Sequence, residues 1–166
     1  MKSVFTIGYE GTDIDRFLRT LQIVGIETVA DVRAIPLSRK KGFSKNTLKA
    51  RLEEVGIKYL PLSALGDPKP GREAAKAGDL AKFRHIYSAH VDRPDSALVI
   101  AELAKTAERT KVCLLCFERD PKTCHRLIVG ERMAPYGYTM SHLYADDPQR
   151  YVRNGARLVT SPPALA

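Results

Sequence analysis

The chain has 166 residues, of which 44% are hydrophobic and 28% charged, the balance of a soluble globular domain rather than of a disordered, fibrous or membrane protein. A domain of this size buries roughly 70% of its unfolded surface, so its core needs no disulfide or metal. No apolar run approaches the ~18 residues of a membrane-spanning helix, and the first residues lack a signal-peptide pattern. We therefore expect a single-domain cytoplasmic protein.

The chain contains three cysteines, an odd number, and they lie close together at Cys113, Cys116 and Cys124. A disulfide framework needs pairs of cysteines spread along a short secreted chain. This pattern therefore favours reduced thiols.

The net charge of +8 is concentrated in one segment. Residues 33–51, which we call the basic stripe, contain no Asp or Glu and seven basic residues: Arg33, Arg39, Lys40, Lys41, Lys45, Lys49 and Arg51. A patch of one charge attracts polyanions, so a phosphate-bearing partner is one interpretation. The alternative is a solvated basic face that serves solubility.

The first third of the chain predicts two helix–strand units after an initial strand. Residues 4–7 form that strand and lead into a turn at residues 8–11. A helix then begins at Thr12 as N-cap and ends at Gly25, and a second begins at Ser44 and ends at Gly56. Each helix leads into a strand, at residues 28–33 and 57–60.

The middle of the chain predicts a loop and two helices. Residues after Gly66 are polar and contain Pro68, Pro70 and Gly71, which predicts an exposed loop and a candidate lid. Two apolar patterns of helical spacing follow: Leu80, Phe83 and Tyr87, then Val99, Leu103 and Ala107.

The last third predicts two further strands, at residues 111–117 and 139–143, separated by a helix. That helix begins near Thr123, ends before Pro135, and turns Leu127, Ile128 and Ala134 inward. The alternation of strands and helices indicates a single α/β domain, with a mostly parallel sheet flanked by helices in a Rossmann-like three-layer arrangement.

We expect this domain to span residues 1–144. Residues 145–166 would form a C-terminal extension, because Asn154-Gly155 within residues 151–159 is typical of a type I′ hairpin. The last residues, 161–166, would be a frayed end.

Polar residues follow several of the predicted strands, and ligands of open α/β sheets bind at these carboxyl ends. The segment of residues 116–126 is the most informative, because a strand, a tight turn and a helix start bring Cys124, His125 and Arg126 together. Helix N-termini bind anions and lower the pKa of thiols. Cys124 is therefore a candidate nucleophile, with His125 or Glu118 as acid or base, although a buried packing role is the alternative.

Other cysteine chemistries fit less well. Cys113 and Cys116 are three apart in a strand and would face opposite sides, which disfavours a dithiol switch. A zinc site built from these two with Cys124 and His125 has suitable residue types, but strand faces and adjacent ligands argue against tetrahedral geometry. A Cys-x5-Arg loop from Cys116 fails because residue 122 is Lys122.

These motifs together resemble the family called domain of unknown function 488. The likeness is carried, in order, by residues 6–9, 29–38, Tyr59 with Leu65-Gly66, and residues 115–121 with Cys124-His125-Arg126. The chain departs from the pattern at Asp67, where a second glycine is expected, and at Phe117, where a small residue is expected. The resemblance supports the fold and the position of the site but implies no reaction.

Our first hypothesis is an enzyme that acts on a phosphate-bearing substrate, such as a nucleotide or nucleic acid, at the carboxyl edge of the sheet. The alternative is a noncatalytic nucleic-acid-binding module that uses the basic stripe. We expect no cofactor and no metal. The candidate catalytic residues are Glu118, Cys124 and His125, and the candidate substrate-binding residues are Gly8, Tyr9, Asp31, Arg33, Ser38, Tyr59, Cys116 and Arg126.

Overall fold

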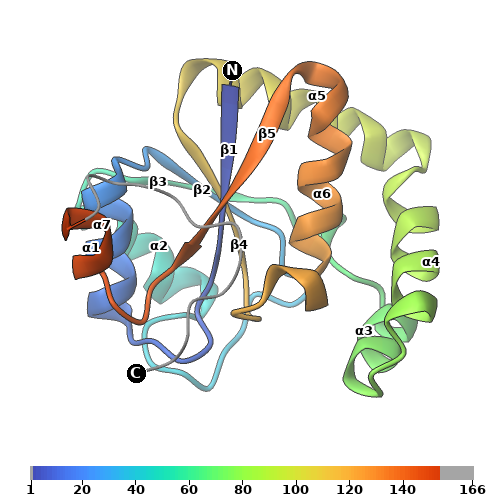
Figure 1. The fold of residues 1–166 in the computed structure, drawn as a ribbon, viewed down its shortest axis with the longest axis horizontal. Helices are drawn as coiled ribbons and strands as arrows, with labels where there is room; N and C mark the ends of the chain where they lie inside the picture. Colours follow the sequence, from blue (N-terminus) through green and yellow to red (C-terminus); the bar gives the residue numbers. More distant parts are fainter. Residues whose placement is uncertain (1, 154–166) are drawn as a thin grey trace.

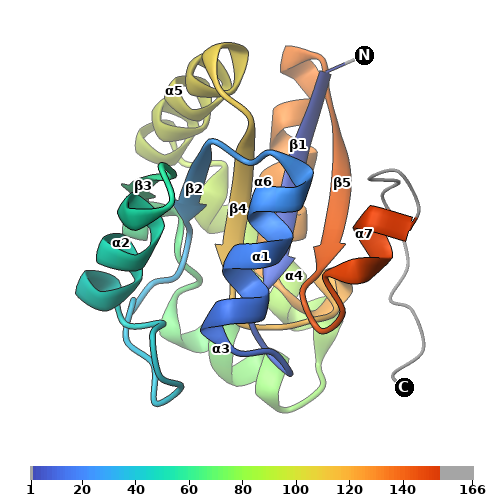
Figure 2. The same ribbon diagram turned by 90° about the vertical axis from the view of Figure 1, so that its left-hand side faces the viewer.

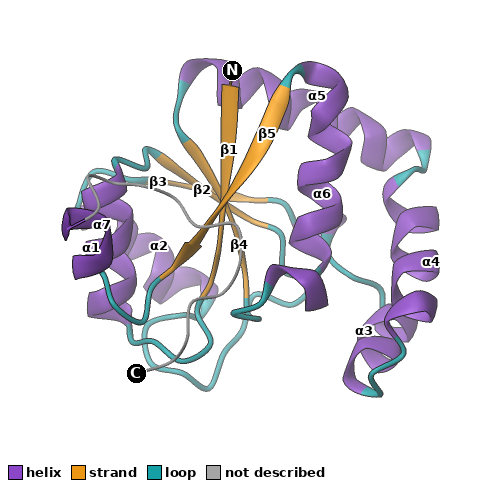
Figure 3. Cartoon of the chain, viewed as in Figure 1, coloured by secondary structure: helices purple, strands orange, loops and turns teal. Residues whose placement is uncertain are grey.

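The computed structural model describes residues 2–153, which form a single α/β domain built on a five-stranded sheet. All strand pairs are parallel, and the strand order is β3-β2-β4-β1-β5 (Figures 1 and 3). The predicted α/β class is confirmed, and each predicted strand is present. The strands are β1 (Lys2–Gly8), β2 (Thr28–Asp31), β3 (Lys58–Pro61), β4 (Val112–Cys116) and β5 (Tyr138–Tyr144).

Helices cover both faces of the sheet, which gives the three predicted layers (Figures 1 and 2). One face carries α1 (Ile14–Val24), α2 (Lys45–Glu54) and α7 (Gln149–Arg153). The other side carries α3 (Lys69–Lys76), α4 (Leu80–Val91), α5 (Pro94–Arg109) and α6 (His125–Met133). None of the helices formed by residues 2–153 combines the length and the apolar character needed to cross a membrane.

Strand β4 lies in the middle of the sheet and is buried along its whole length. Its side chains alternate between two apolar cores: Cys113 and Leu115 pack in the core under α1, whereas Val112 and Leu114 pack in the core under α5 and α6. This alternation follows from the two-residue period of a strand. It also separates Cys113 from Cys116, as predicted.

The loops after β1 and β4 leave the sheet toward opposite faces. Strands β1 and β4 are neighbours, with Gly8 paired to Cys116, yet β1 leads into α1 and β4 leads into α6. Such a divergence opens a crevice at the carboxyl ends of the two strands, where α/β sheets bind ligands. The topology therefore places the site between these two loops.

The start of α1 differs from the prediction by one residue. Its N-cap is Asp13, whose carboxylate accepts a hydrogen bond from the Arg16 backbone N–H at 2.8 Å. The predicted N-cap, Thr12, instead donates its hydroxyl to the Ala145 carbonyl at 2.7 Å. A carboxylate outcompetes a hydroxyl here because it also pairs with the Arg16 side chain.

The prediction of an exposed loop after Gly66 was wrong, because the centre of this segment forms helix α3. Pro70 lies in the first turn, where a missing N–H breaks no helical hydrogen bond. Gly71 serves close packing, since a Cβ at this position would lie 2.0 Å from Asp67 Oδ1. Pro70 and Gly71 are thus compatible with helix α3, although both residue types usually interrupt helices. The segment that we expected to be a loop and a candidate lid is therefore helical.

Two smaller predictions were also wrong. Ala134 is exposed and Leu127 is half-buried, whereas Val129 and Met133 are among the buried residues of α6, with Ile128. Residues 151–153 of the predicted hairpin belong to α7, which packs on α1 through the buried Tyr151. Residues 154–159, the rest of that hairpin, and the expected frayed end lie outside the described residues. The expected domain boundary at residue 144 stays a prediction.

Candidate functional site

A cavity of about 560 Å³ lies at the carboxyl ends of β1, β2 and β4. The loops that follow these strands form its floor, and α3 and α4 contribute one wall. The lining side chains combine thiols, carboxylates and cations with apolar groups: Tyr9, Glu10, Arg33, Ala34, Ile35, Leu37, Asp67, Arg72, Ala75, Lys76, Phe83, Cys116, Phe117, Glu118, Thr123, Cys124 and His125.

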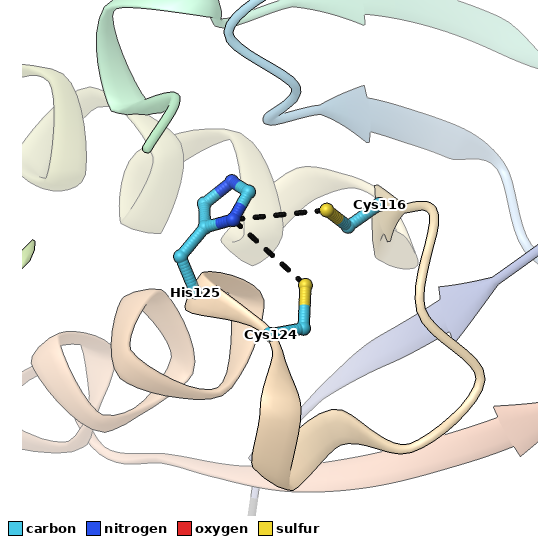
Figure 4. Close-up of side chains that lie close together, drawn as sticks. All are labelled: Cys116, Cys124 and His125. Atoms are coloured by element: carbon cyan, nitrogen blue, oxygen red, sulfur yellow. Dashed lines mark hydrogen bonds between the residues drawn. The ribbon is translucent and has the colours of Figure 1, made fainter. Parts of the chain in front are cut away.

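Two thiols and one imidazole meet in the cavity floor (Figure 4). Cys116 Sγ lies 3.7 Å from His125 Nδ1, and Cys124 Sγ lies 3.8 Å from the same nitrogen. Cys116 ends β4, whereas Cys124 is the N-cap of α6 and has an extended backbone. Because the backbone is extended at Cys124 and helical at His125, the side chains of both residues point toward Cys116.

The second nitrogen of the imidazole has a fixed partner. His125 Nε2 lies 2.5 Å from the Val32 carbonyl oxygen, which can only accept a hydrogen bond. Nε2 is therefore protonated and donates, which leaves Nδ1 directed at the two sulfurs. The end of β2 thus sets the orientation of the ring.

Electrostatics distinguish the two thiols. Burial opposes ionisation of Cys124, but the hydrogen bond from Cys116 and the charges of Arg126 and His125 outweigh burial and lower the pKa of Cys124 well below its ordinary value. The pKa of Cys116 is raised, first by its hydrogen bond to Cys124 and then by burial. Burial lowers the pKa of His125, yet the Cys124 charge raises it overall. The arrangement favours a Cys124 thiolate beside an imidazolium.

Glu118 adds a carboxyl group to the same floor. The Cys116 thiol donates to Glu118 Oε2 at 3.3 Å. Burial, with a smaller effect of the Cys124 charge, raises the pKa of Glu118 to about 7. A carboxyl with this pKa exchanges protons near neutral pH, which is the property that acid–base catalysis requires.

Asp67 is a site residue that the sequence reasoning missed. Its side chain lines the cavity, is buried, and has one oxygen, Oδ1, without a hydrogen-bond partner. Burial raises the pKa of Asp67 to about 6. Its only signal in the sequence was the departure from the family pattern after Gly66. Arg72 and Lys76, four residues apart on α3, also line the cavity and were not predicted.

Arg126 does not line the cavity. It is completely buried, and its Nη1 and Nη2 donate to the Glu118 and Arg119 carbonyls at 2.5 and 3.1 Å. These two carbonyls accept from the guanidinium, whereas its Nε has no hydrogen-bond partner among the residues that the structure describes. Arg126 therefore holds the loop after β4 in place, and Gly8 does the same from the other side, since a Cβ there would lie 1.7 Å from the Glu118 carbonyl oxygen.

The residues predicted at the end of β2 form a separate polar cluster. Arg33 Nη2 and Asp31 Oδ2 are 2.8 Å apart, and both side chains are at most 5% exposed. The Arg33 guanidinium also donates to Tyr9 Oη at 3.2 Å and to the Phe43 carbonyl at 2.7 Å. Tyr59 donates its hydroxyl to Asp31 Oδ2 at 2.6 Å. Asp31 and Arg33, both candidate substrate-binding residues, thus form a buried ion pair with each other.

The predicted site residues divide into two groups. Six of them line the cavity: Tyr9, Arg33, Cys116, Glu118, Cys124 and His125. The other five do not, and Ser38, for example, exchanges hydrogen bonds with Ser44 at 3.0 and 3.1 Å. Proximity in sequence to a strand end therefore identified the region, but not which side chains face the cavity.

The cavity floor also contains a set of metal-binding atoms. One ligand atom each from Cys116, Cys124 and His125 lies within 4.8 Å of the others. Cys113 is excluded because it packs in the core on the other face of β4. The adjacent Cys124 and His125 both reach Cys116 because the backbone changes from extended at the N-cap to helical at the next residue, whereas the expected misfit to a tetrahedral site stays a prediction.

The basic stripe is not a uniform surface. Arg33 is buried in its ion pair, Arg51 pairs with Asp15 at 2.9 Å, and Lys40 Nζ donates to the Thr12 carbonyl at 2.6 Å. The four remaining basic side chains are exposed: Arg39, Lys41, Lys45 and Lys49.

Comparison with known proteins gives a family but no activity. Neither the curated proteins nor the solved structures contain a match to this chain. A family model, described as domain of unknown function DUF488, matches residues 13–133, which include the ends of β2 and β4 and the Cys116–His125 floor of the cavity. The match covers most of the chain and agrees with the resemblance drawn from the sequence motifs. The chain therefore belongs to the DUF488 family.

Proposed function

We propose that this protein is an enzyme that attacks a phosphate-bearing substrate with the Cys124 thiolate. The observation that carries the proposal is the position of Cys124 Sγ, 3.8 Å from His125 Nδ1 in the floor of a cavity large enough for a small molecule. A nucleophilic thiol beside a correctly oriented imidazole is the usual arrangement for covalent catalysis by cysteine.

Glu118 is the proposed proton carrier. The Cys124 sulfur would form a bond to the electrophilic atom of the substrate while the bond to the leaving oxygen breaks. That oxygen would take its proton from the Glu118 carboxyl group. Water would then attack the covalent intermediate, return a proton to the Glu118 carboxylate, and release Cys124 as thiolate. Water is the one reactant besides the substrate, and the two steps return Cys124 and Glu118 to their starting protonation states.

Two cations on α3 support an anionic substrate. Arg72 and Lys76 are one helical turn apart and line the same cavity wall. Arg72 Nη1 donates to the Asp67 carbonyl at 2.7 Å, which holds the guanidinium beside the cavity. We assign phosphate binding to these two residues in place of Arg33 and Arg126, because the donors of Arg33 are engaged by groups of the protein and Arg126 does not line the cavity. Reduced thiols also agree with the expected cytoplasmic location.

The test is turnover of a panel of phosphate esters, from p-nitrophenyl phosphate and bis-p-nitrophenyl phosphate to nucleotides, by wild-type protein and by Cys124→Ser. We expect at least one ester to be hydrolysed, with rapid quenching and mass spectrometry revealing an adduct on the peptide that contains Cys124. Turnover that survives Cys124→Ser would contradict the proposal.

The second candidate function is nucleic-acid binding without catalysis. Four exposed basic side chains at the start of α2 and in the preceding loop favour it. The stripe contains one aromatic residue, Phe43, and it is buried, so base stacking by this segment is excluded. Binding would therefore depend on phosphate contacts, and binding of labelled oligonucleotides across a salt series measures it.

A further inference from the structure

The cavity floor has a second chemical capability besides nucleophilic attack. Two sulfurs and one imidazole nitrogen converge there from β4 and from the start of α6 (Figure 4). Thiolates and imidazole are the ligands that zinc and similar soft divalent cations prefer. We propose that Cys116, Cys124 and His125 bind a thiophilic divalent metal ion, and that the bound ion reversibly blocks Cys124.

The distances fit such an ion. In a tetrahedral zinc site with sulfur at about 2.3 Å and nitrogen at about 2.0 Å from the metal, sulfur and nitrogen ligands lie roughly 3.5 Å apart. The two sulfurs lie 3.7 and 3.8 Å from His125 Nδ1, and the three ligand atoms fall within 4.8 Å of one another. Only small side-chain movements are therefore needed for all three to reach one ion.

The imidazole is already held as a metal ligand requires. A ligating histidine usually donates its other N–H to a carbonyl or carboxylate, which fixes the ring and the free nitrogen. The Val32 carbonyl accepts from His125 Nε2 in this way, and it lies directly after β2. This contact is independent of the two cysteines and points to the same ion position.

The ion would keep an open position. Three protein ligands leave a tetrahedral site one ligand short, which is the arrangement of exchangeable rather than closed structural sites. All three residues line the cavity, so the ion can enter from it.

Metal binding and catalysis would exclude each other. A sulfur bound to zinc is no longer a free nucleophile, so the ion would inhibit the enzyme until a competing ligand removes it. The inhibitory part of this inference depends on the proposed function, whereas metal binding itself does not. Sulfur and imidazole nitrogen bind a metal only without their protons, so binding should also acidify an unbuffered solution.

The experiment uses metal-free, reduced full-length protein and the metal ions alone. Addition of Co²⁺ should give sulfur-to-cobalt charge-transfer absorption that saturates at one ion per chain, and Zn²⁺ should abolish this absorption. The variants Cys116→Ser and Cys124→Ser should each weaken Zn²⁺ binding at least tenfold. Cys113→Ala, which removes the third thiol from the opposite face of the same strand, should leave binding unchanged.

A second measurement separates this inference from the proposed function. Iodoacetamide labelling of Cys124 is followed by mass spectrometry with and without one equivalent of Zn²⁺. Protection by zinc supports the inference even if no substrate is ever turned over. Absence of stoichiometric cobalt binding, or binding that survives both cysteine variants with unchanged circular dichroism, would overturn it. A reactive Cys124 that zinc fails to protect would overturn the inhibitory role alone and leave the proposed nucleophile intact.

Discussion

Two polar clusters lie at the same edge of the sheet, and they differ in whether their polar groups are satisfied. In the cluster of Asp31, Arg33 and Tyr59, hydrogen bonds within the protein engage the carboxylate and the guanidinium on several sides. The side chains of Cys116, Cys124 and His125 line the same cavity as Arg33, but there two sulfurs converge on one imidazole nitrogen, and the pKa of Cys124 is lowered.

The comparison teaches that charge and burial alone do not identify a reactive site. Both clusters are buried, and both contain the residue types found in active sites. A closed network stabilises one conformation, whereas groups directed into a cavity retain capacity for a ligand. We therefore assign a structural role to the first cluster and a chemical role to the second, and the following changes test that division.

The largest effect is expected from Cys124→Ser. If Cys124 is the nucleophile, turnover of any ester hydrolysed by the wild type should fall at least about 10⁴-fold, because loss of a nucleophile leaves only binding and electrostatic contributions. The melting temperature should change little, since the substitution replaces one atom. Steady-state kinetics and thermal unfolding measure the two quantities. A large loss of stability with activity intact would show that Cys124 has a structural role and is not the nucleophile.

The next effect is on stability and belongs to the closed cluster. Asp31→Asn leaves the Arg33 charge buried without a counterion, which should lower the free energy of unfolding by about 3–5 kcal/mol. Asp15→Asn is the matched control, because Asp15 pairs with Arg51 at the surface and should contribute about 1 kcal/mol or less. Urea unfolding of the two variants measures the difference. Equal effects would show that the buried pair is not a structural centre.

A smaller effect on catalysis is expected from Glu118→Gln. Removal of a proton carrier should reduce turnover by about 10²-fold while the Cys124 thiol remains open to alkylation. Glu10→Gln is the control, because Glu10 also lines the cavity but accepts a hydrogen bond from the Arg119 backbone N–H. Initial rates of the two variants measure the effect. A greater decrease in turnover with Glu10→Gln would indicate that Glu10 is the proton carrier.

The smallest effect concerns the basic stripe. If the stripe binds nucleic acid, Arg39→Gln with Lys41→Gln should reduce the slope of log affinity against log salt by about 0.9 for each phosphate that the protein no longer neutralises. Lys82→Gln with Lys105→Gln, a matched change on α4 and α5, should leave the slope unchanged. Fluorescence anisotropy of a labelled oligonucleotide measures both. An unchanged slope in both variants would show that the basic stripe is a solvated surface that does not contact the nucleic acid.

The sequence predicted the fold well because local signals mark each strand. Strand β4 is apolar throughout, whereas β3 has no buried residue and was located from Gly56, which ends the helix before it. Helix α3 could not be predicted from local signals, because Pro70 and Gly71 disfavour helices and only the contact with Asp67 explains the glycine. Helix α7 was not predicted because the nearby pair Asn154-Gly155 is a strong local signal for a turn.

The candidate site was predictable as a region but not as a set of contacts. Cys116, Cys124 and His125 could be placed near one another from the order of strand, turn and helix. Which way Arg126 points depends on the path of the loop after β4, whose carbonyls take up its charge. Asp67 comes to the cavity through the packing of α3 against its own N-terminal turn, a tertiary contact that no local pattern records.

The most direct test of the division between the two clusters is the alkylation rate of each cysteine in the folded, metal-free wild-type protein at neutral pH. Iodoacetamide labelling followed by peptide mass spectrometry resolves Cys113, Cys116 and Cys124. We predict that Cys124 reacts much faster than Cys116 and that Cys113 reacts only after unfolding. A Cys124 that also stays unlabelled until the protein unfolds would contradict the assignment of the open cluster as a chemical site.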